Sequence, residues 1–171
     1  EAIVAEIEGG QALNVLIAED HPVNRMILEA WMSSAGHTSA TAENGQIAIE
    51  AAGEQRFDLV IMDVNMPVMD GLTATRAIRA GNGPNTDTPV VVLSASARTE
   101  DHQAGLDAGA DAYLNKPIDF AALAMVMNRV SAGRAGVRAL SAVEEAQAGE
   151  GGRVTALKHW RSKAARPLNL G

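Results

Sequence analysis

Five short, mostly apolar runs recur along the chain, and a more polar, helix-like segment separates each run from the next. They span residues 13–18, 37–42, 59–62, 89–94 and 111–114. Runs this short, apolar at consecutive positions and rich in Val, Leu and Ile, are typical of strands buried on both faces of a sheet. The second run is more polar and suits a sheet edge. The alternation predicts an α/β fold, a doubly wound parallel sheet of five strands with helices on both faces.

Helix signals fill the intervals between the strands. Pro22 opens the first helix, where its missing N–H costs nothing, and Gly36 ends it. Apolar residues at the i, i+3, i+4, i+7 and i+8 positions predict the buried face of this helix. They are Val23, Met26, Ile27, Ala30 and Trp31. Further helices are predicted over residues 45–52, 72–80, 99–108 and from 119 onward, of which the fourth helix, 99–108, has few apolar side chains to bury.

Charge divides the chain into two parts. The formal net charge is −7, but residues 133–171 carry seven basic and three acidic side chains, a net of +4, which leaves −11 for residues 1–132. We expect a lead-in or linker over 1–12, one globular domain over 13–131, and a basic C-terminal extension, partly helical or disordered, over 132–171. The acidic body argues against nucleic-acid binding by that domain.

Composition excludes several kinds of chemistry. The chain has no cysteine, which rules out disulfides, thiolate metal sites and cysteine nucleophiles. Its four histidines are scattered, which argues against zinc. No apolar run approaches a membrane span, and no segment resembles a signal peptide. Because the sequence opens on Glu1 rather than Met, we expect it to be a piece of a longer protein.

Residues that carry chemistry follow four of the five predicted strands. Glu19 and Asp20 come after the first strand, and Asp63 ends the third. Ser94 ends the fourth strand and Lys116 follows the fifth. Taken singly, each has an ordinary explanation as a cap, a turn residue or a solvated charge. Ligands bind at the carboxyl ends of strands in open parallel sheets, so the set together predicts one shared site.

These residue types suit phosphoryl chemistry. Three carboxylates brought close together repel one another unless a cation lies among them, and Mg²⁺ takes one or two carboxylates plus a phosphate. Lys116 offers a positive charge to a phosphoryl oxygen, and Ser94 offers a hydroxyl donor. Asp63 is then a candidate nucleophile, since positioning and charge neutralisation supply most of the catalysis of phosphoryl transfer.

The order and spacing of these motifs resemble the receiver domain of two-component response regulators. The matching motifs are Glu19-Asp20, Asp63 with Met66-Pro67 and Asp70-Gly71, Ser94-Ala95, and Lys116-Pro117. The resemblance covers residues 13–131 and implies a flavodoxin-like sheet with strand order 2-1-3-4-5. The run at residues 19–25 resembles in particular the receivers of hybrid histidine kinases. The chain is therefore expected to be part of such a kinase or a stand-alone regulator.

The resemblance also implies a role for each residue of the site. Asp63 is the phosphoacceptor in a phosphorelay. Asp20, Asp63 and the backbone carbonyl of Asn65 bind Mg²⁺, and Glu19 helps indirectly. Glu19 replaces the Asp that is commoner in the family at this position.

The resemblance implies that two further residues hold the phosphoryl group. It implies that a third residue changes conformation when the group is present. Ser94, which replaces the commoner Thr, and Lys116 hold the group, and Tyr113 is the aromatic switch residue that turns inward. The implied donor is a histidine kinase or a histidine phosphotransfer protein. The resemblance further implies a cytoplasmic location and a homodimer formed through the fourth helix, fifth strand and fifth helix.

Two other functions stay open. A phosphohydrolase of the haloacid dehalogenase type also uses an aspartyl nucleophile after a strand, but its second acid lies where this chain has Asn65, which cannot exchange a proton as an acid can. A receiver-like interaction module without phosphorylation would lack the acid, the hydroxyl or the lysine, and all are present here. We therefore predict a phosphoacceptor with slow self-dephosphorylation rather than an enzyme.

Overall fold

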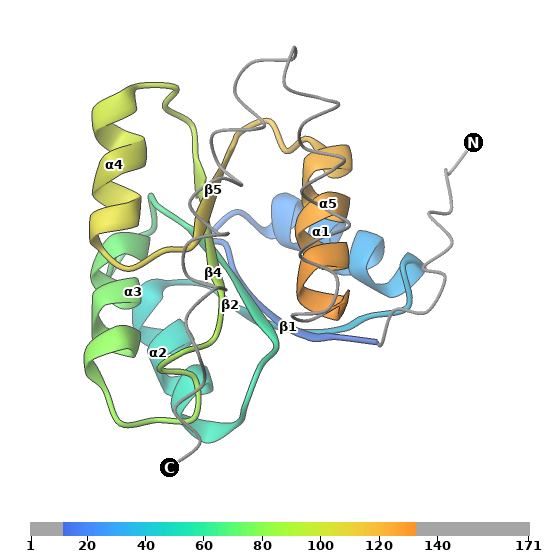
Figure 1. The fold of residues 1–171 in the computed structure, drawn as a ribbon, viewed down its shortest axis with the longest axis horizontal. Helices are drawn as coiled ribbons and strands as arrows, with labels where there is room; N and C mark the ends of the chain where they lie inside the picture. The colour runs from blue at the N-terminus through green and yellow to red at the C-terminus, as the bar shows by residue number, and fades with distance from the viewer. Residues whose placement is uncertain (1–11, 133–171) are drawn as a thin grey trace.

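The computed structural model describes residues 12–132, and the fold is a five-stranded parallel sheet in the order β2-β1-β3-β4-β5 (Figure 1). The strands are β1 Asn14–Ala18, β2 Thr38–Ala42, β3 Leu59–Asp63, β4 Val90–Ser94 and β5 Ala112–Asn115. The doubly wound sheet and its strand order, both expected from the sequence, are confirmed. The lead-in predicted over residues 1–12 and the extension predicted over 132–171 lie almost entirely outside the described residues.

Strand composition follows position in the sheet. All residues of the inner strands β3 and β4 are buried, because helices cover both faces of the sheet there. The edge strand β2 is polar and mostly exposed, as its sequence predicts. The register places Asp63 beside Leu93 and Ser94 beside Asn115. The chemically important ends of β3, β4 and β5 therefore lie next to one another.

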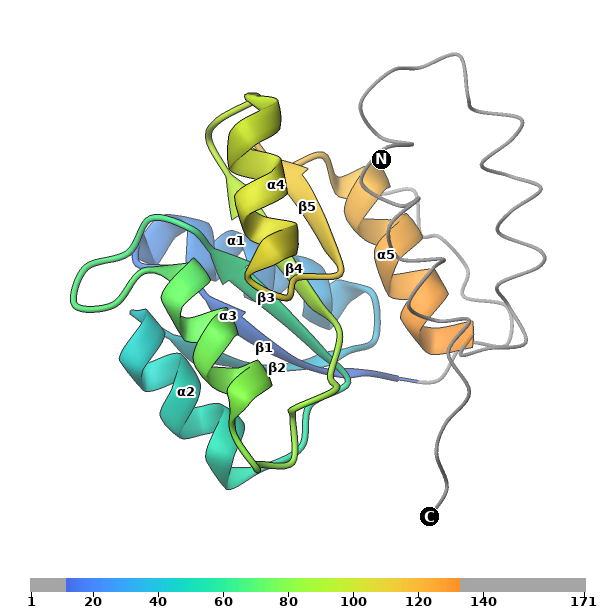
Figure 2. The same ribbon diagram turned by 60° about the vertical axis from the view of Figure 1, so that its left-hand side comes forward.

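The helices form one layer on each face of the sheet. They are α1 Pro22–Ser34, α2 Gly45–Glu54, α3 Gly71–Ala80, α4 Thr99–Asp107 and α5 Phe120–Ala132. Helices α1 and α5 cover one face, and α2, α3 and α4 cover the other (Figures 1 and 2). Each layer closes a separate apolar core. No helix within residues 12–132 is long and apolar enough to cross a membrane.

Side-chain caps begin several of the helices, α2 and α3 among them. Asn44 Oδ1 accepts a hydrogen bond of 2.9 Å from the Ile47 N–H at the start of α2. Asp70 Oδ1 accepts one of 2.9 Å from the Thr73 N–H at the start of α3. Such caps satisfy amide groups that have no partner in the first turn of a helix. The turn residues Asn44-Gly45 and Asp70-Gly71 thus place their helices as the sequence predicts.

The predicted buried face of α1 is wrong except for Trp31, which packs against the core. Leu28 and Met32 are the buried residues of this helix, whereas Val23, Met26 and Ile27 are 50%, 62% and 46% exposed. Apolar side chains occupy more of the α1 surface than the sheet can cover. The stripe that packs inward is therefore decided by contacts with the sheet and α5, which helical periodicity alone does not reveal.

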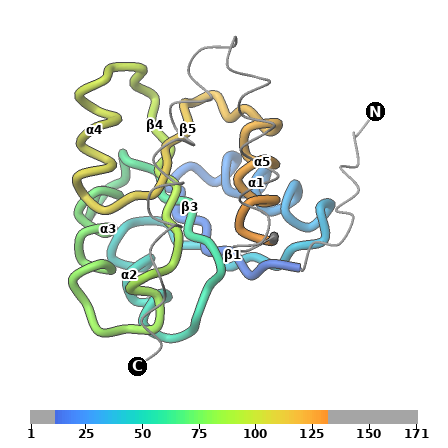
Figure 3. The backbone as a smooth tube through the Cα atoms, viewed as in Figure 1, coloured from blue at the N-terminus to red at the C-terminus, as the bar shows by residue number. Residues whose placement is uncertain are grey.

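Helices α1 and α5 meet through an aromatic pair. The rings of Trp31 and Phe120 are tilted by 32°, with their centroids 5.7 Å apart. Along α5, Leu123, Val126 and Met127 are buried against the sheet. The start of β1 and the end of α5 lie at the edge of the sheet opposite the carboxyl ends of the strands (Figure 3), because α5 runs back antiparallel to β5.

Candidate functional site

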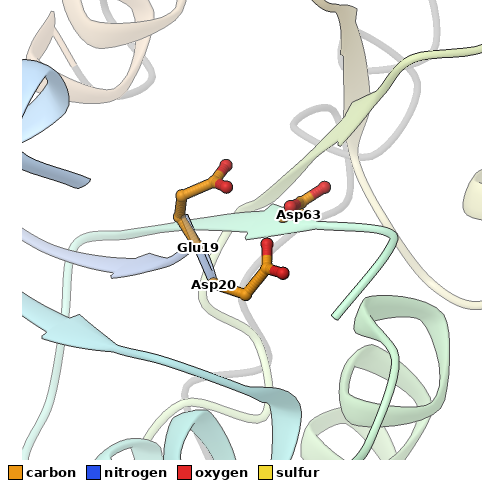
Figure 4. A group of neighbouring side chains, drawn as sticks. All are labelled: Glu19, Asp20 and Asp63. Carbon is orange, nitrogen blue, oxygen red and sulfur yellow. The ribbon is translucent and has the colours of Figure 1, made fainter. Parts of the chain in front are cut away.

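Three carboxylates converge at the carboxyl edge of the sheet. Glu19 and Asp20 directly follow β1, and Asp63 is the last residue of β3, its neighbour in the sheet. One carboxylate oxygen from each lies within 4.8 Å of the others (Figure 4). Glu19 and Asp63 are buried while Asp20 is exposed, so the cluster opens to solvent on the side of Asp20.

The Asp63 carboxylate is almost completely buried. The residue is 2% exposed, and its Oδ1 accepts a 3.3 Å hydrogen bond from the Asn65 N–H. Burial raises the pKa of Asp63 to about 6; the bond from Lys116 opposes this rise, and the charge of Glu19 adds to it. Near neutral pH the group is therefore mostly an anion, held in a site that disfavours the charge.

Lys116 joins two of the carboxylates. Its Nζ lies 2.9 Å from Glu19 Oε2 and 3.0 Å from Asp63 Oδ2. Burial lowers the pKa of Lys116, but the hydrogen bonds and charges of Glu19 and Asp63 outweigh that effect and raise it overall. The backbone N–H of Lys116 donates to the Ser94 carbonyl at 2.8 Å. This bond fixes the lysine beside the end of β4.

Arg25, which the sequence did not single out, holds the loop after β1. Its Nη1 donates to the backbone carbonyls of Glu19 at 2.8 Å and of Asp20 at 3.0 Å, and its Nη2 lies 3.7 Å from Glu43 Oε1. One guanidinium therefore fixes the backbone of two consecutive acidic residues. One feature of the sequence could have indicated this role: an arginine lies in the first turns of the helix that directly follows the acidic pair.

The backbone after β3 is tightly constrained. An ideal Cβ on Gly71 would lie 2.0 Å from the Asp63 carbonyl oxygen, so no side chain fits there. Val68 has a φ of 68°, and the Met69 N–H donates to the Pro67 carbonyl at 2.7 Å. A β-branched residue with positive φ is unusual and strained. The loop that carries Asn65 is thus held close against Asp63.

Ser94 ends β4, and Tyr113 lies in β5, the neighbouring strand of the sheet. The Ser94 hydroxyl accepts a hydrogen bond of 3.1 Å from the Ser96 N–H and donates one of 3.4 Å to the Ser96 carbonyl. Tyr113 is 7% exposed, and its ring stacks on that of His102 in α4. Burial raises the pKa of the Tyr113 hydroxyl. Tyr113 was expected to turn inward on activation; in this structure it is already buried.

The donor set is chemically consistent with a hard divalent cation. Three carboxylates share a small volume with one ammonium, which leaves uncompensated negative charge and oxygen ligands only. Zinc would favour nitrogen or sulfur ligands. Mg²⁺ binds oxygen ligands and keeps several waters, which suits a cluster with one solvent-facing member. The residues present therefore fit a magnesium ion.

Comparison with known proteins identifies the family. A family model described as the response regulator receiver domain matches residues 15–128, which is more than half of the chain. The chain belongs to the response regulator receiver family. This receiver domain is 39% identical over 126 residues to hybrid signal transduction histidine kinase G of Dictyostelium discoideum, covering 72% of this chain and 4% of that kinase.

Shorter relatives match the receiver domain as well. The transcriptional regulatory protein PrrA of Mycobacterium tuberculosis is 42% identical over 109 residues, which cover 64% of this chain and 46% of PrrA. Two-component response regulator ORR41 of Oryza sativa subsp. japonica is 37% identical, with 67% of this chain and 91% of that protein covered. The chain thus spans less than half of the kinase and of PrrA.

Solved structures share the receiver fold. The receiver domain of sensor histidine kinase PA1611 from Pseudomonas aeruginosa, with magnesium coordinated in its active-site cleft, superposes with a TM-score of 0.64 at 36% identity, covering 70% of this chain and 97% of that one. The receiver domain of Saccharomyces cerevisiae Ssk1, in complex with the histidine phosphotransfer protein Ypd1, gives a TM-score of 0.65 at 28% identity, with 71% and 90% covered.

Proposed function

We propose that Asp63 accepts a phosphoryl group from a phosphohistidine of a partner protein in a magnesium-dependent reaction. The observation that carries this proposal is the setting of the Asp63 carboxylate. It is buried, 3.0 Å from the ammonium of Lys116, and within 4.8 Å of the carboxylates of Glu19 and Asp20. Membership of the receiver family supports the same conclusion.

The magnesium ion would be held by the carboxylates of Asp20 and Asp63 and the backbone carbonyl of Asn65, with Glu19 acting indirectly. When bound, the ion neutralises charge on the phosphoryl oxygens. The magnesium found in the receiver of PA1611 supports this assignment. The burial that raises the pKa of Asp63 also strengthens its attraction to a cation, since water screens the charge less there.

In the proposed reaction, an Asp63 oxygen attacks phosphorus and the bond from phosphorus to the imidazole nitrogen breaks. The imidazole leaves with its electron pair and takes a proton from solvent, and Asp63 becomes an acyl phosphate. Lys116, now paired with Asp63, is placed to follow the charge onto a phosphoryl oxygen. The Ser94 hydroxyl, at the end of the neighbouring strand, is the second donor.

Hydrolysis of this acyl phosphate is expected to be slow. A general acid or base two residues after the nucleophile would speed it, but Asn65 stands there and does not exchange a proton. Asn65 contacts Asp63 through its backbone N–H. We therefore place the chain with phosphoacceptors rather than with phosphohydrolases.

The exposed apolar side of α1 is the proposed docking surface for the donor. Val23, Met26 and Ile27 lie on the first turns of the helix that starts two residues after Asp20. A partner that brings a histidine to Asp63 would cover these side chains. Burying them would stabilise the complex, since large exposed apolar groups gathered on one surface mark interaction sites.

Phosphorylation is proposed to shift the chain between conformations that both exist beforehand, with Ser94 and Tyr113 as the residues that move. Self-association through the face formed by α4, β5 and α5 stays a prediction. Light scattering of the chain with and without beryllofluoride, a phosphoryl mimic, checks it.

A direct test is intact-mass measurement after incubation with Mg²⁺ and acetyl phosphate. We expect the mass of one phosphoryl group to be added, to be absent when EDTA replaces Mg²⁺, and to be absent in Asp63→Asn. Asp87→Asn is the matched control, because Asp87 is exposed and lies before β4, at the opposite edge of the sheet. A chain that gains no mass, or an Asp63→Asn variant that gains the same mass, would overturn the proposal.

A further inference from the structure

His102 in α4 touches three parts of the chain at once. Its ring stacks on the ring of Tyr113 in β5, with centroids 3.7 Å apart and planes 16° from parallel. Its Nε2 lies 3.1 Å from the Ser96 carbonyl oxygen, in the loop between β4 and α4. The same nitrogen lies 2.9 Å from Asn115 Oδ1 at the end of β5. The contacts of Nε2 fix the imidazole in the plane of its ring, and the stacking on Tyr113 fixes it perpendicular to that plane.

The Ser96 carbonyl determines where the proton of the ring lies. A carbonyl oxygen only accepts hydrogen bonds, so His102 Nε2 carries a hydrogen and donates it. The oxygen of Asn115, rather than its amide nitrogen, then faces the imidazole. One N–H is therefore shared between the loop after β4 and the end of β5, and it ties these two segments together.

Both acceptors of the His102 N–H, the Ser96 carbonyl and the Asn115 side chain, belong to residues that lie next to the phosphoryl site. We call these two hydrogen bonds of His102 the tie. Ser96 exchanges hydrogen bonds with the Ser94 hydroxyl through its N–H and its carbonyl. Asn115 directly precedes Lys116, whose N–H donates to the Ser94 carbonyl at 2.8 Å. His102 is thereby connected to both residues proposed to hold the phosphoryl group, although it touches neither.

A phosphoryl group on Asp63 would change the bonds of Ser94. The Ser94 hydroxyl has one proton, and rotating it toward a phosphoryl oxygen on Asp63 turns that proton away from the Ser96 carbonyl. Once Ser94 turns away, the Ser96 carbonyl keeps the hydrogen bond from His102. The imidazole therefore still links this loop to Asn115 and Tyr113 of β5.

We propose that His102 is a positioning residue that couples the Ser94 hydroxyl to Tyr113 and α4. This inference rests on the proposed phosphorylation of Asp63 and adds to it the route by which the signal leaves the site. Helix α4 suits the role, because Gly105 is its only buried residue, and weakly packed elements move at low cost. The sequence drew no attention to His102 beyond excluding it from a metal site.

Two variants of the full chain separate coupling from packing. His102→Phe keeps an aromatic face against Tyr113 but removes the shared N–H. Gln103→Ala is the matched control, because exposed Gln103 bonds only within α4, to Asp107 at 2.8 Å. Tyr113 is the single tyrosine of the chain, so fluorotyrosine labelling gives one ¹⁹F signal that reports this ring alone.

The first measurement needs no phosphoryl donor. Amide hydrogen exchange over residues 95–103 should be faster in His102→Phe by roughly threefold or more, as expected for the loss of one net hydrogen bond, and unchanged in Gln103→Ala. His102→Gln, which keeps an N–H donor, should fall between the two and guards against a fold defect specific to phenylalanine. Equal exchange rates in all variants would show that the hydrogen bonds of His102 do not stabilise residues 95–103, and would overturn the proposal.

The second measurement adds Mg²⁺ and acetyl phosphate and follows mass and the ¹⁹F signal together. We expect His102→Phe to gain the phosphoryl group as the unsubstituted chain does, while the displacement of its Tyr113 signal on phosphorylation falls to about half or less. A full displacement in His102→Phe would overturn the coupling. If the unsubstituted chain gains no mass, the proposed function and the coupling both fail, and hydrogen exchange still decides whether the tie exists.

Discussion

The ammonium of Lys116 lies 3.0 Å from a carboxylate oxygen of Asp63, yet the pKa of Asp63 is raised to about 6. Burial is the larger effect, and the neighbouring charge of Glu19 adds to it. The ion pair therefore does not compensate fully for the loss of water around the Asp63 carboxylate. A site in this condition gains from a further cation or from any reaction that removes the carboxylate charge.

Replacing Asp63 by Asn should stabilise the chain near neutral pH. Asp63 has its pKa raised from 3.8 to about 6, so between these values the folded state binds more protons than the unfolded state. Its contribution to stability is thus present below about pH 4 and lost as the pH rises through about 6. We expect Asp63→Asn to raise the free energy of unfolding by about 2 kcal/mol at about pH 7.5 and by much less at about pH 4.

Urea unfolding in EDTA at both pH values checks this expectation. A variant that is less stable than the unsubstituted chain at the higher pH would show that the Lys116 pair outweighs burial. Asp87→Asn serves again as the control, with a change of roughly 0.5 kcal/mol or less expected at a surface position.

Magnesium should stabilise the folded chain, and the effect should depend on Asp20. Binding at one hundred times the dissociation constant contributes about 2.7 kcal/mol. Asp20→Asn removes the solvent-facing member of the carboxylate cluster, so it should abolish most of the increase in melting temperature without a large change in the metal-free protein. Differential scanning calorimetry with and without Mg²⁺ measures this. An undiminished increase in Asp20→Asn would place the ion elsewhere.

A charge on the exposed side of α1 should impair transfer from a protein donor but not from a small molecule. Met26 is 62% exposed and lies within the proposed docking surface. We expect Met26→Glu to slow transfer from a phosphorylated histidine phosphotransfer protein by about tenfold or more, while labelling by acetyl phosphate is unchanged. Ile47→Glu is the matched control, since Ile47 is a 37% exposed apolar residue of α2, on the other face of the sheet. Equal slowing by both variants would contradict a docking role for α1.

Two glycine substitutions should have opposite effects on stability. A Cβ at Gly71 would lie 2.0 Å from the Asp63 carbonyl oxygen, whereas a Cβ at Gly53 in α2 would meet nothing within 4 Å. Gly71→Ala should lower the free energy of unfolding by about 2 kcal/mol or more and reduce phosphoryl uptake. Gly53→Ala should raise the free energy by about 0.5–1 kcal/mol, the usual gain of helix propensity. Chemical denaturation and mass measurement distinguish them, and a neutral Gly71→Ala would contradict the close approach.

Most of the fold and the site's main residues follow from local sequence patterns. Buried strands are apolar throughout, and Asp63 and Lys116 lie at strand ends that any parallel sheet brings to one edge. The buried side of α1 could not be predicted in this way. Val23 and Leu28 both have apolar neighbours at helical spacing, and only packing against α5 and the sheet decides which of the two is covered.

Contacts between distant segments explain the other omissions. His102 and Tyr113 lie eleven positions apart on a helix and a strand, and nothing in either segment alone indicates that their rings stack. In the sequence, Arg25 is indistinguishable from an ordinary surface residue of a helix. Its role depends on the hydrogen bonds that it donates to the carbonyls of Glu19 and Asp20. Such roles depend on backbone atoms, which carry no signature in the sequence.

Strand β1 begins, and α5 ends, on the edge of the sheet opposite the carboxyl ends of the strands (Figure 3), whereas Asp63 lies at the carboxyl end of β3. The two ends of the described domain are therefore both distant from the carboxylates of Glu19, Asp20 and Asp63. In the proposed function, this polarity would let a phosphoryl donor approach the carboxylate edge of the described domain from the side that holds neither end.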